Sequence, residues 1–171
     1  MTLFWAANAA MPTTAANAAA ATVSGCKTYL QIATPATRAI SVVAFGVEFS
    51  STVTVATTVE LVDTAAIAAS GLTAHVAAGV QPYGMGANGT AVSQMTLGTG
   101  ATGYAPGTAT EGSTVATRTG KLKILPVGAN NYEWEWSLGR EFVVAPSRFL
   151  RVRLTTTTTS PTVSLWVLWD E

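Results

Sequence analysis

Charged residues are scarce in this sequence. Asp, Glu, Lys and Arg make up 11% of its 171 residues, far below the roughly 25% that is usual in soluble domains. Nine basic and nine acidic residues cancel to a formal net charge of zero. Non-specific nucleic-acid binding needs a surplus of Lys and Arg to neutralise phosphates, so we expect no nucleic-acid partner. The low charge also removes the self-repulsion that keeps monomers apart, which favours association between copies of the chain.

Cysteine and histidine occur once each. The single Cys26 excludes an intrachain disulfide. A nucleophile and an interchain bridge are alternatives for it, but no cysteine-type motif surrounds it, and a small apolar packing residue is the simpler interpretation. Because His75 stands alone, the sequence contains no histidine-based metal set and no catalytic triad. The acidic residues lack calcium-loop spacing. We therefore predict no metal, no cofactor and no enzymatic activity.

Long apolar runs are also missing. A membrane helix needs roughly 18 to 20 continuous, strongly apolar residues, and no stretch approaches this, so we expect no membrane partner. Residues 1–26 are apolar and uncharged, but they lack the basic region of a secretory signal, and Pro12 and Asn17 interrupt any apolar core. The sequence is expected to be a soluble chain that is made in the cytoplasm and not cleaved.

Alanine, threonine and valine are abundant instead, and β-branched residues favour strands. Short runs with a period of two are punctuated by Pro, Gly, Ser and Thr, which is typical of a β-sandwich or a barrel. We predict an all-β fold, a single sandwich of roughly eight to ten strands. The strand-like runs are 28–33, 38–49, 53–63, 113–119, 121–125, 132–136, 140–144, 148–154 and 163–169.

The composition divides the chain into an Ala-rich N-terminal arm, residues 1–26, and a sandwich domain, residues 27–171. The aromatic pair Phe4 and Trp5 is interpreted as an anchor that lies on the chain's own body or on a neighbouring subunit. Residues 64–112 are predicted to form a long Gly/Thr-rich insertion or loop, because 64–110 contain no charged residue. The motif for a phosphate-binding loop is absent from it. We expect it to face a partner rather than to be disordered.

Individual residues offer two functional hypotheses and one structural one. Glu133 and Glu135, two residues apart on one strand face, are the nominal catalytic pair, although a solvated face is the simpler interpretation. Trp134 and Trp136 lie on the other face and are either core residues or a sugar-binding platform. Gly46, within a long strand, suggests a bulge or bend.

The C-terminal residues are the most informative part of the sequence. Arg148, Arg151 and Arg153 fall within six residues, and Arg151 and Arg153 point away from the leucines and valine of their strand. Phosphate or carboxylate binding is one interpretation. The preferred one is cross-strand pairing with Glu133, Glu135 or Glu141, within one subunit or across an interface. The threonine run 155–159 is interpreted as the connector of a hairpin. The last strand has apolar residues on both faces. We expect one face to be covered by the opposite sheet and the other by the chain's own arm or by a neighbour.

Parts of the chain resemble small β-sandwich proteins encoded in the structural-gene clusters of tailed bacteriophages. The resemblance rests on Leu30-Gln31-Ile32-Ala33-Thr34-Pro35, on Gly139-Arg140-Glu141, and on the terminal aromatic strand that ends in acid. It covers about half of the chain and leaves out the N-terminal arm and the 64–110 segment. It implies a virion component, a capsid decoration (cement) protein with a jelly-roll-like body that is located on the capsid surface and has no catalytic residues.

The leading hypothesis is therefore a non-enzymatic protein that self-associates, with a trimer favoured, and binds the major capsid protein to stabilise a phage head. A carbohydrate-binding or host-adhesion module using Trp134, Trp136 or Tyr104 is the alternative, and a hydrolase based on Glu133 and Glu135 is a weaker third. The candidate interface residues are Phe4, Trp5, Tyr83, Met85, Tyr104, Arg148, Arg151, Arg153 and Trp166.

Overall fold

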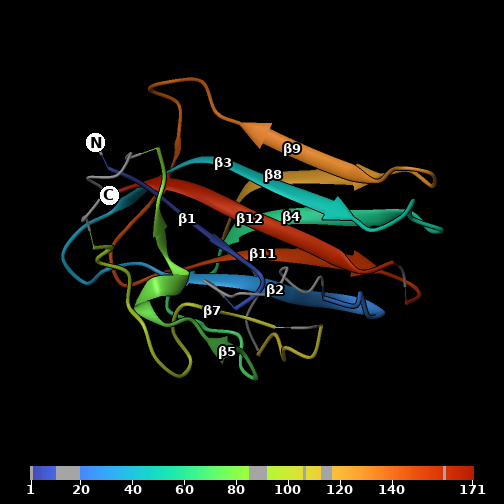
Figure 1. Ribbon diagram of the computed structural model, residues 1–171, viewed down its shortest axis with the longest axis horizontal. Coiled ribbons are helices and arrows are strands. Elements are labelled where there is room, and N and C mark those ends of the chain that lie inside the picture. Colours follow the sequence, from blue (N-terminus) through green and yellow to red (C-terminus); the bar gives the residue numbers. More distant parts are fainter. Residues whose placement is uncertain (1, 11–19, 85–91, 106, 113–116, 160) are drawn as a thin grey trace.

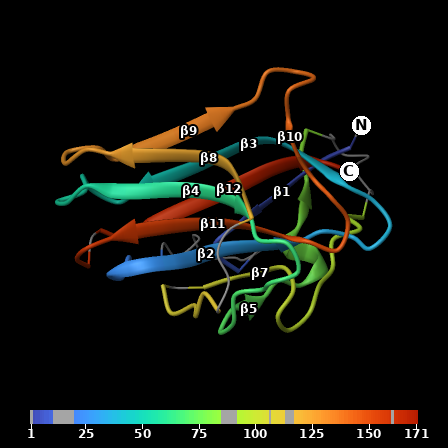
Figure 2. The same cartoon turned by 180° about the vertical axis from the view of Figure 1, so that it is seen from behind.

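A computed structural model describes residues 2–10, 20–84, 92–105, 107–112, 117–159 and 161–171. Within these ranges the chain forms twelve strands and one short 3-10 helix, η1 (Ala77–Gly79), and no α-helix. The strands make two antiparallel sheets that face each other, with β3, β12 and β1 of one sheet in front in Figure 1, and β8, β4, β11 and β2 of the other in front in Figure 2. The predicted all-β class is confirmed.

The two sheets, here called sheet A and sheet B, contain six strands each. Sheet A runs in the order β10 (Phe142–Val144), β3 (Ile40–Phe49), β12 (Val163–Asp170), β1 (Leu3–Ala7) and β6 (Gln81–Pro82), and β9 (Asn131–Glu135) pairs with β3 further along that strand. Sheet B runs in the order β5 (Thr73–Ala74), β7 (Gly103–Tyr104), β2 (Gly25–Ala33), β11 (Phe149–Thr156), β4 (Thr57–Asp63) and β8 (Arg118–Leu125).

The core lies between the sheets and follows the alternation expected from a period of two. On β12, Val163, Leu165, Val167 and Trp169 are fully buried, while the residues between them are half-buried. On β11, Leu150, Val152 and Leu154 face the same core. Each such side chain contributes about 1.5–3 kcal/mol when it leaves water. This repeated burial holds the two sheets face to face.

Residues 3–7 are an integral strand and not a free arm. β1 pairs along its whole length with β12 and also with β6. The Phe4 ring is 2% exposed, and its centroid is 6.4 Å from that of Trp169. The anchor was expected on the chain's own body or on a neighbouring subunit, and the first alternative holds for Phe4. Its place among the candidate interface residues is wrong, because the side chain is already enclosed by the chain's own core. Residues 11–19 of the expected arm lie outside the described residues.

The segment expected to be a long loop packs closely on its own chain. It contributes β5, η1, β6 and β7, and these short strands raise the total above the eight to ten that the sequence predicts. His75, Thr102 and Ala105 are buried in it. Backbone bonds fasten it to sheet B, such as Thr96 N–H to the Ala33 carbonyl at 3.0 Å. An uncharged composition is compatible with this packing because few charges need to be desolvated.

Three further expectations are corrected by the strand pairing. The threonine run does not connect a hairpin, because β11 belongs to sheet B and β12 to sheet A, so the chain crosses between sheets there. β11 finds its partners in β2 and β4 instead. The irregularity in β3 is not at Gly46 but at the register shift opposite Leu168 and Trp169. Likewise, a single strand, β8, runs through Gly120, with its register shift at that residue.

Candidate functional site

Three of the predicted interface residues meet on the outer face of sheet A. Trp5 from β1, Tyr83 just after β6, and Trp166 from β12 line a hollow of about 270 Å³ together with Leu168. The four side chains come from three parts of the sequence that are far apart. Tyr83 is 52% exposed, and the other three are half-buried. We call this site the outer-face hollow.

Strand register explains why these side chains meet. Trp5 lies opposite Leu168, and Ala7 lies opposite Trp166, so both pairs share the face that points away from the core. Tyr83 is brought alongside by its N–H, which donates to the Leu3 carbonyl at 2.8 Å. Directly opposite residues in an antiparallel pair have their Cβ atoms about 5 Å apart. The result is a continuous apolar surface beside the edge strand β6.

Three carboxylates border this surface. Glu133 and Glu135, on β9, lie opposite Gly46 and Ala44 of β3. Glu48 is on the same face of β3 as those two residues. All three are exposed, and within the described residues none of their carboxylates has a hydrogen bond or an ion pair. Glu133 and Glu135 project side by side from one strand and do not oppose each other across a cleft, as the two carboxyls of a glycosidase must. The arrangement forms an acidic rim beside an apolar hollow.

The tryptophans proposed as a sugar platform do not form one. Trp136 packs against the core, with its ring 6.0 Å from Phe45. Trp134 is 38% exposed, but the Lys121 ammonium lies over its face at 3.1 Å from the centroid. Tyr104 is in the other sheet, where its ring contacts His75 at 4.9 Å. Trp134 and Trp136 meet edge to face, with their ring centroids 6.4 Å apart and their planes at 84°, so they do not present one flat surface to a sugar, and Tyr104 does not join them.

The arginine-rich strand pairs with acids, but not with those predicted. The Arg148 Nε lies 2.8 Å from Asp63, Arg151 Nη1 lies 3.3 Å from Glu111, and Arg153 Nη2 lies 3.1 Å from Glu60. The prediction that they pair with Glu133, Glu135 or Glu141 within one subunit is wrong, because β9 and β10 are in sheet A, whereas β11 is in sheet B. Pairing with these glutamates across an interface stays a prediction.

Arg151 serves the chain itself and not a partner. Its side chain has no exposed surface, and burial lowers its pKa despite the nearby carboxylate of Glu111. The guanidinium donates to the backbone carbonyls of Glu111 and Ile67, while the Glu111 carboxylate accepts from the Thr28 N–H and hydroxyl. Arg151 was expected at an interface, and this expectation is wrong for the same reason as for Phe4. The residue ties the 64–112 segment to sheet B.

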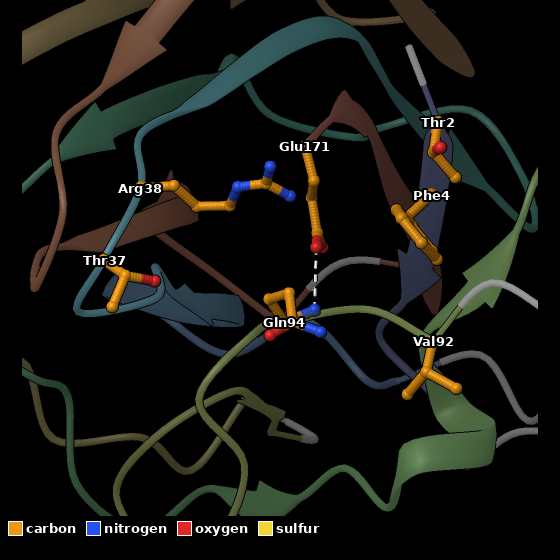
Figure 3. Close-up of a pocket in the computed structure, with 7 residues that line it drawn as sticks. All are labelled: Thr2, Phe4, Thr37, Arg38, Val92, Gln94 and Glu171. Carbon is orange, nitrogen blue, oxygen red and sulfur yellow. Dashed lines mark hydrogen bonds between the residues drawn. The ribbon is translucent and has the colours of Figure 1, made fainter.

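A second hollow, of about 440 Å³, lies beside the chain termini (Figure 3). The Glu171 carboxylate accepts hydrogen bonds from the Gln94 N–H at 2.7 Å and from the Trp169 indole at 3.0 Å. The Arg38 side chain extends toward Glu171 in Figure 3 and is exposed, and it has no ion pair within the described part of the chain. This hollow has one free cation and one saturated carboxylate, and it lacks an acid–base pair.

His75 and Cys26 take no part in either hollow. The buried imidazole forms a 2.9 Å hydrogen bond through Nε2 with the Ala7 carbonyl, and burial lowers its pKa. Cys26 is a half-buried free thiol. Among the residues described, no three His, Cys, Asp or Glu side chains are grouped to hold a metal ion. The same residues include no helix with the length and apolarity required to cross a bilayer.

Of the remaining predicted interface residues, Arg148 and Arg153 are partly exposed and engaged in ion pairs, and Met85 lies outside the described residues. Sequence reasoning missed Leu168, Glu111 and Asp63. Their roles depend on partners far away in the sequence, as the hydrogen bond from Arg148 to Asp63 shows by spanning 85 residues.

Comparison of the chain with protein-family models, with curated proteins and with solved structures found no match.

Proposed function

We propose that this protein is a non-enzymatic structural protein that self-associates and binds the outer surface of a phage capsid, which it stabilises. The observation that carries the proposal is the convergence of Trp5, Tyr83 and Trp166 on one open apolar hollow. Trp and Tyr are enriched among residues that dominate protein–protein binding energy. A monomer leaves such aromatic surface in contact with water only at a cost, and a partner that covers it removes that cost.

The low overall charge supports the same proposal. Four of the chain's nine basic residues, Arg118, Arg148, Arg151 and Arg153, form ion pairs within the chain. The sandwich surface therefore offers little charge repulsion to a second copy. The resemblance of the C-terminal strands to phage virion proteins supports a capsid as the larger partner, with the major capsid protein as the contact. Repetition over a symmetric lattice makes modest contacts collectively strong.

The finer fold assignment belongs to this proposal as well. The strands β1, β2, β3 and β4 alternate between sheet A and sheet B, and the chain crosses again between β11 and β12. Repeated crossing between two antiparallel sheets supports a jelly-roll-like sandwich. In such a body the outer face of sheet A is available for contact with neighbouring subunits of a trimer.

Self-association tests the proposal through Tyr83. Tyr83→Ala removes the most exposed aromatic of the outer-face hollow, and Leu122→Ala is a matched control because Leu122 is 49% exposed on the other sheet. In sedimentation velocity, we expect the wild type and Leu122→Ala to form the oligomer with the same dissociation constant. For Tyr83→Ala we expect a dissociation constant that is roughly tenfold higher. Equal behaviour of all three proteins would contradict a role for the hollow in self-association.

Capsid binding needs its own measurement. Phage heads assembled without this chain should bind added wild-type protein and resist heating better afterwards. Tyr83→Ala should co-sediment with the heads more weakly than Leu122→Ala. Heads that bind neither the wild type nor the control would rule out the capsid as partner while leaving self-association standing.

Glycan binding is the second candidate, and one observation favours it. The acidic rim of Glu133 and Glu135 borders the hollow that contains Trp5 and Trp166, and sugars are bound by aromatic faces with polar groups beside them. On a glycan array, specific binding that is lost in Trp5→Ala and in Glu133→Gln would favour this function. Absence of specific binding by the wild type would rule it out for the glycans tested.

A further inference from the structure

A third hollow, of about 470 Å³, opens between the two sheets and is separate from the outer-face hollow. It is lined on the side of sheet B by Asp63, Arg118 and Arg148, and on the other side by Ala39, Val143, Ala145 and Pro146. Asp63 ends β4, Arg118 begins β8, and Arg148 immediately precedes β11. We call this site the arginine cleft. Its charged wall and its apolar wall come from different sheets.

One buried carboxylate holds both arginines in place. The Asp63 side chain is 2% exposed, and its two oxygens lie 2.8 and 3.0 Å from the Arg148 Nε. The Arg118 Nη2 lies 3.4 Å from Oδ2 of the same carboxylate. The Ala65 N–H donates a further hydrogen bond to Oδ1 at 3.0 Å. Asp63 is thus saturated from inside the protein and orients two guanidinium groups toward one cleft.

Additional contacts restrict both guanidinium groups. The central carbon of Arg118 lies 4.3 Å from the centroid of the Phe142 ring, and its Nη2 also donates to the Val143 carbonyl. The Arg148 Nη2 donates to the Thr117 hydroxyl at 3.2 Å. Restriction of this kind lowers the entropy lost when a ligand binds. The two cations are therefore preorganised.

Donors remain free on both arginines. Within the described residues, Nε and Nη1 of Arg118 and Nη1 of Arg148 donate to no protein atom, and none of the three is among the buried atoms that lack a partner. The arginine side chains retain 49% and 31% of their exposure. Two cations and one carboxylate leave a net charge of +1, and the other lining residues are uncharged. The cleft thus presents unused N–H donors and one uncompensated positive charge.

We infer that the arginine cleft binds a carboxylate presented by an acidic side chain of a partner polypeptide. A carboxylate carries one negative charge, which matches the uncompensated charge, and its two oxygens can accept hydrogen bonds from the free N–H donors of the two guanidinium groups. The apolar wall of Ala39, Val143, Ala145 and Pro146 suits the methylene groups of a glutamate. A phosphate dianion would leave an unbalanced negative charge beside Asp63. The inference does not depend on the outer-face hollow or on the partner being a capsid.

The test uses small probes and the full-length protein. Nitrogen NMR of the arginine Nε–H groups would follow titrations with N-acetylglutamate α-amide, with its neutral glutamine counterpart, and with inorganic phosphate. We expect saturable shifts at Arg118 and Arg148 with the glutamate compound and none with the glutamine compound. Phosphate should bind more weakly than the glutamate compound. Saturation by the glutamate compound at a lower concentration than by phosphate, with no shift for the glutamine compound, would establish the preference for a carboxylate.

Two variants separate this site from general surface charge. Arg118→Gln should lower the affinity for the glutamate compound by about tenfold, because it removes free donors and the excess charge. Arg140→Gln, which removes an exposed arginine in the β9–β10 connection, should leave its binding unchanged. A thermal melt of each variant checks that it folds. If Arg118→Gln does not fold, the titrations of the wild type with the glutamate and glutamine compounds test the inference on their own.

Three results would overturn the inference. They are equal shifts with the glutamate and glutamine compounds, undiminished binding of the glutamate compound in a folded Arg118→Gln protein, and tighter binding of phosphate than of the glutamate compound. None of these depends on whether Tyr83→Ala affects self-association. A failure of the proposed function and a failure of this inference are therefore distinguishable.

Discussion

The indole ring of Trp166 lies directly over the backbone of Gly46. The two residues are opposite each other on β12 and β3, and a Cβ built on Gly46 would come within 2.5 Å of the ring. A real Cβ does not tolerate such an approach, so glycine is required here by the space that the indole occupies. The absent side chain allows the indole to lie against sheet A and to form one wall of the outer-face hollow.

Gly46→Ala should therefore destabilise the protein by about 1–3 kcal/mol, because the added methyl group forces the indole or the strands to shift. Urea denaturation would measure the change. In a Trp166→Leu background the same substitution should cost much less, since the ring is gone. An equal cost of Gly46→Ala in both backgrounds would show that the contact with Trp166 is not responsible.

Glu111→Gln should destabilise the protein by about 3 kcal/mol, because it leaves the fully buried Arg151 without a counter-charge. Adding Arg151→Met to Glu111→Gln should recover part of the loss, because it removes the unpaired charge while the glutamine can still accept from the Thr28 N–H. Glu133→Gln is the control, since this exposed side chain has no partner in the described residues and should change stability by less than about 0.5 kcal/mol. Equal effects of Glu111→Gln and Glu133→Gln in urea denaturation would contradict the assignment.

His75 should make stability depend on pH in mildly acidic solution. Burial lowers the pKa of His75 below its ordinary value of 6.5, against the opposing effect of the hydrogen bond to the Ala7 carbonyl. Below pH 6.5 the unfolded chain binds a proton that the folded chain does not, so stability falls as the pH decreases from 6.5 toward the folded-state pKa. Above pH 6.5 this group contributes no slope.

Urea denaturation between about pH 5.5 and 7, above the range in which ordinary carboxylates titrate, would measure the slope. His75→Gln keeps an N–H donor for Ala7 and removes the titration, so its curve should be flatter. If the two proteins show the same slope, another group causes the dependence.

Lys121→Met should cost about 0.5–1 kcal/mol, because it removes the ammonium from the face of Trp134 while keeping most of the side chain. Lys123→Met is the matched control, two residues further along the same face of β8 and without an aromatic contact in the described residues. Thermal unfolding would compare them. Identical melting temperatures for the two variants would argue that the cation–ring contact contributes nothing measurable.

Several local features of the fold were predictable from the sequence because they depend only on neighbouring residues. The alternation of Leu150, Val152 and Leu154 with Arg151 and Arg153 follows from the period of two, as does the alternation along β12. A side chain's face is set by its position in the strand, whatever strand lies beside it. The all-β class and the position of most long strands therefore follow from composition and periodicity.

The partners of those residues were decided only by the tertiary structure. Asp63, Glu60 and Glu111 pair with the arginines because β4 and the 64–112 segment join sheet B, whereas β9 with Glu133 and Glu135 joins sheet A. The same topology makes Phe4 a core residue and brings Trp5, Tyr83 and Trp166 to one surface. Strand order depends on contacts between residues far apart in the chain, and a local pattern contains no information about which distant strand will be adjacent.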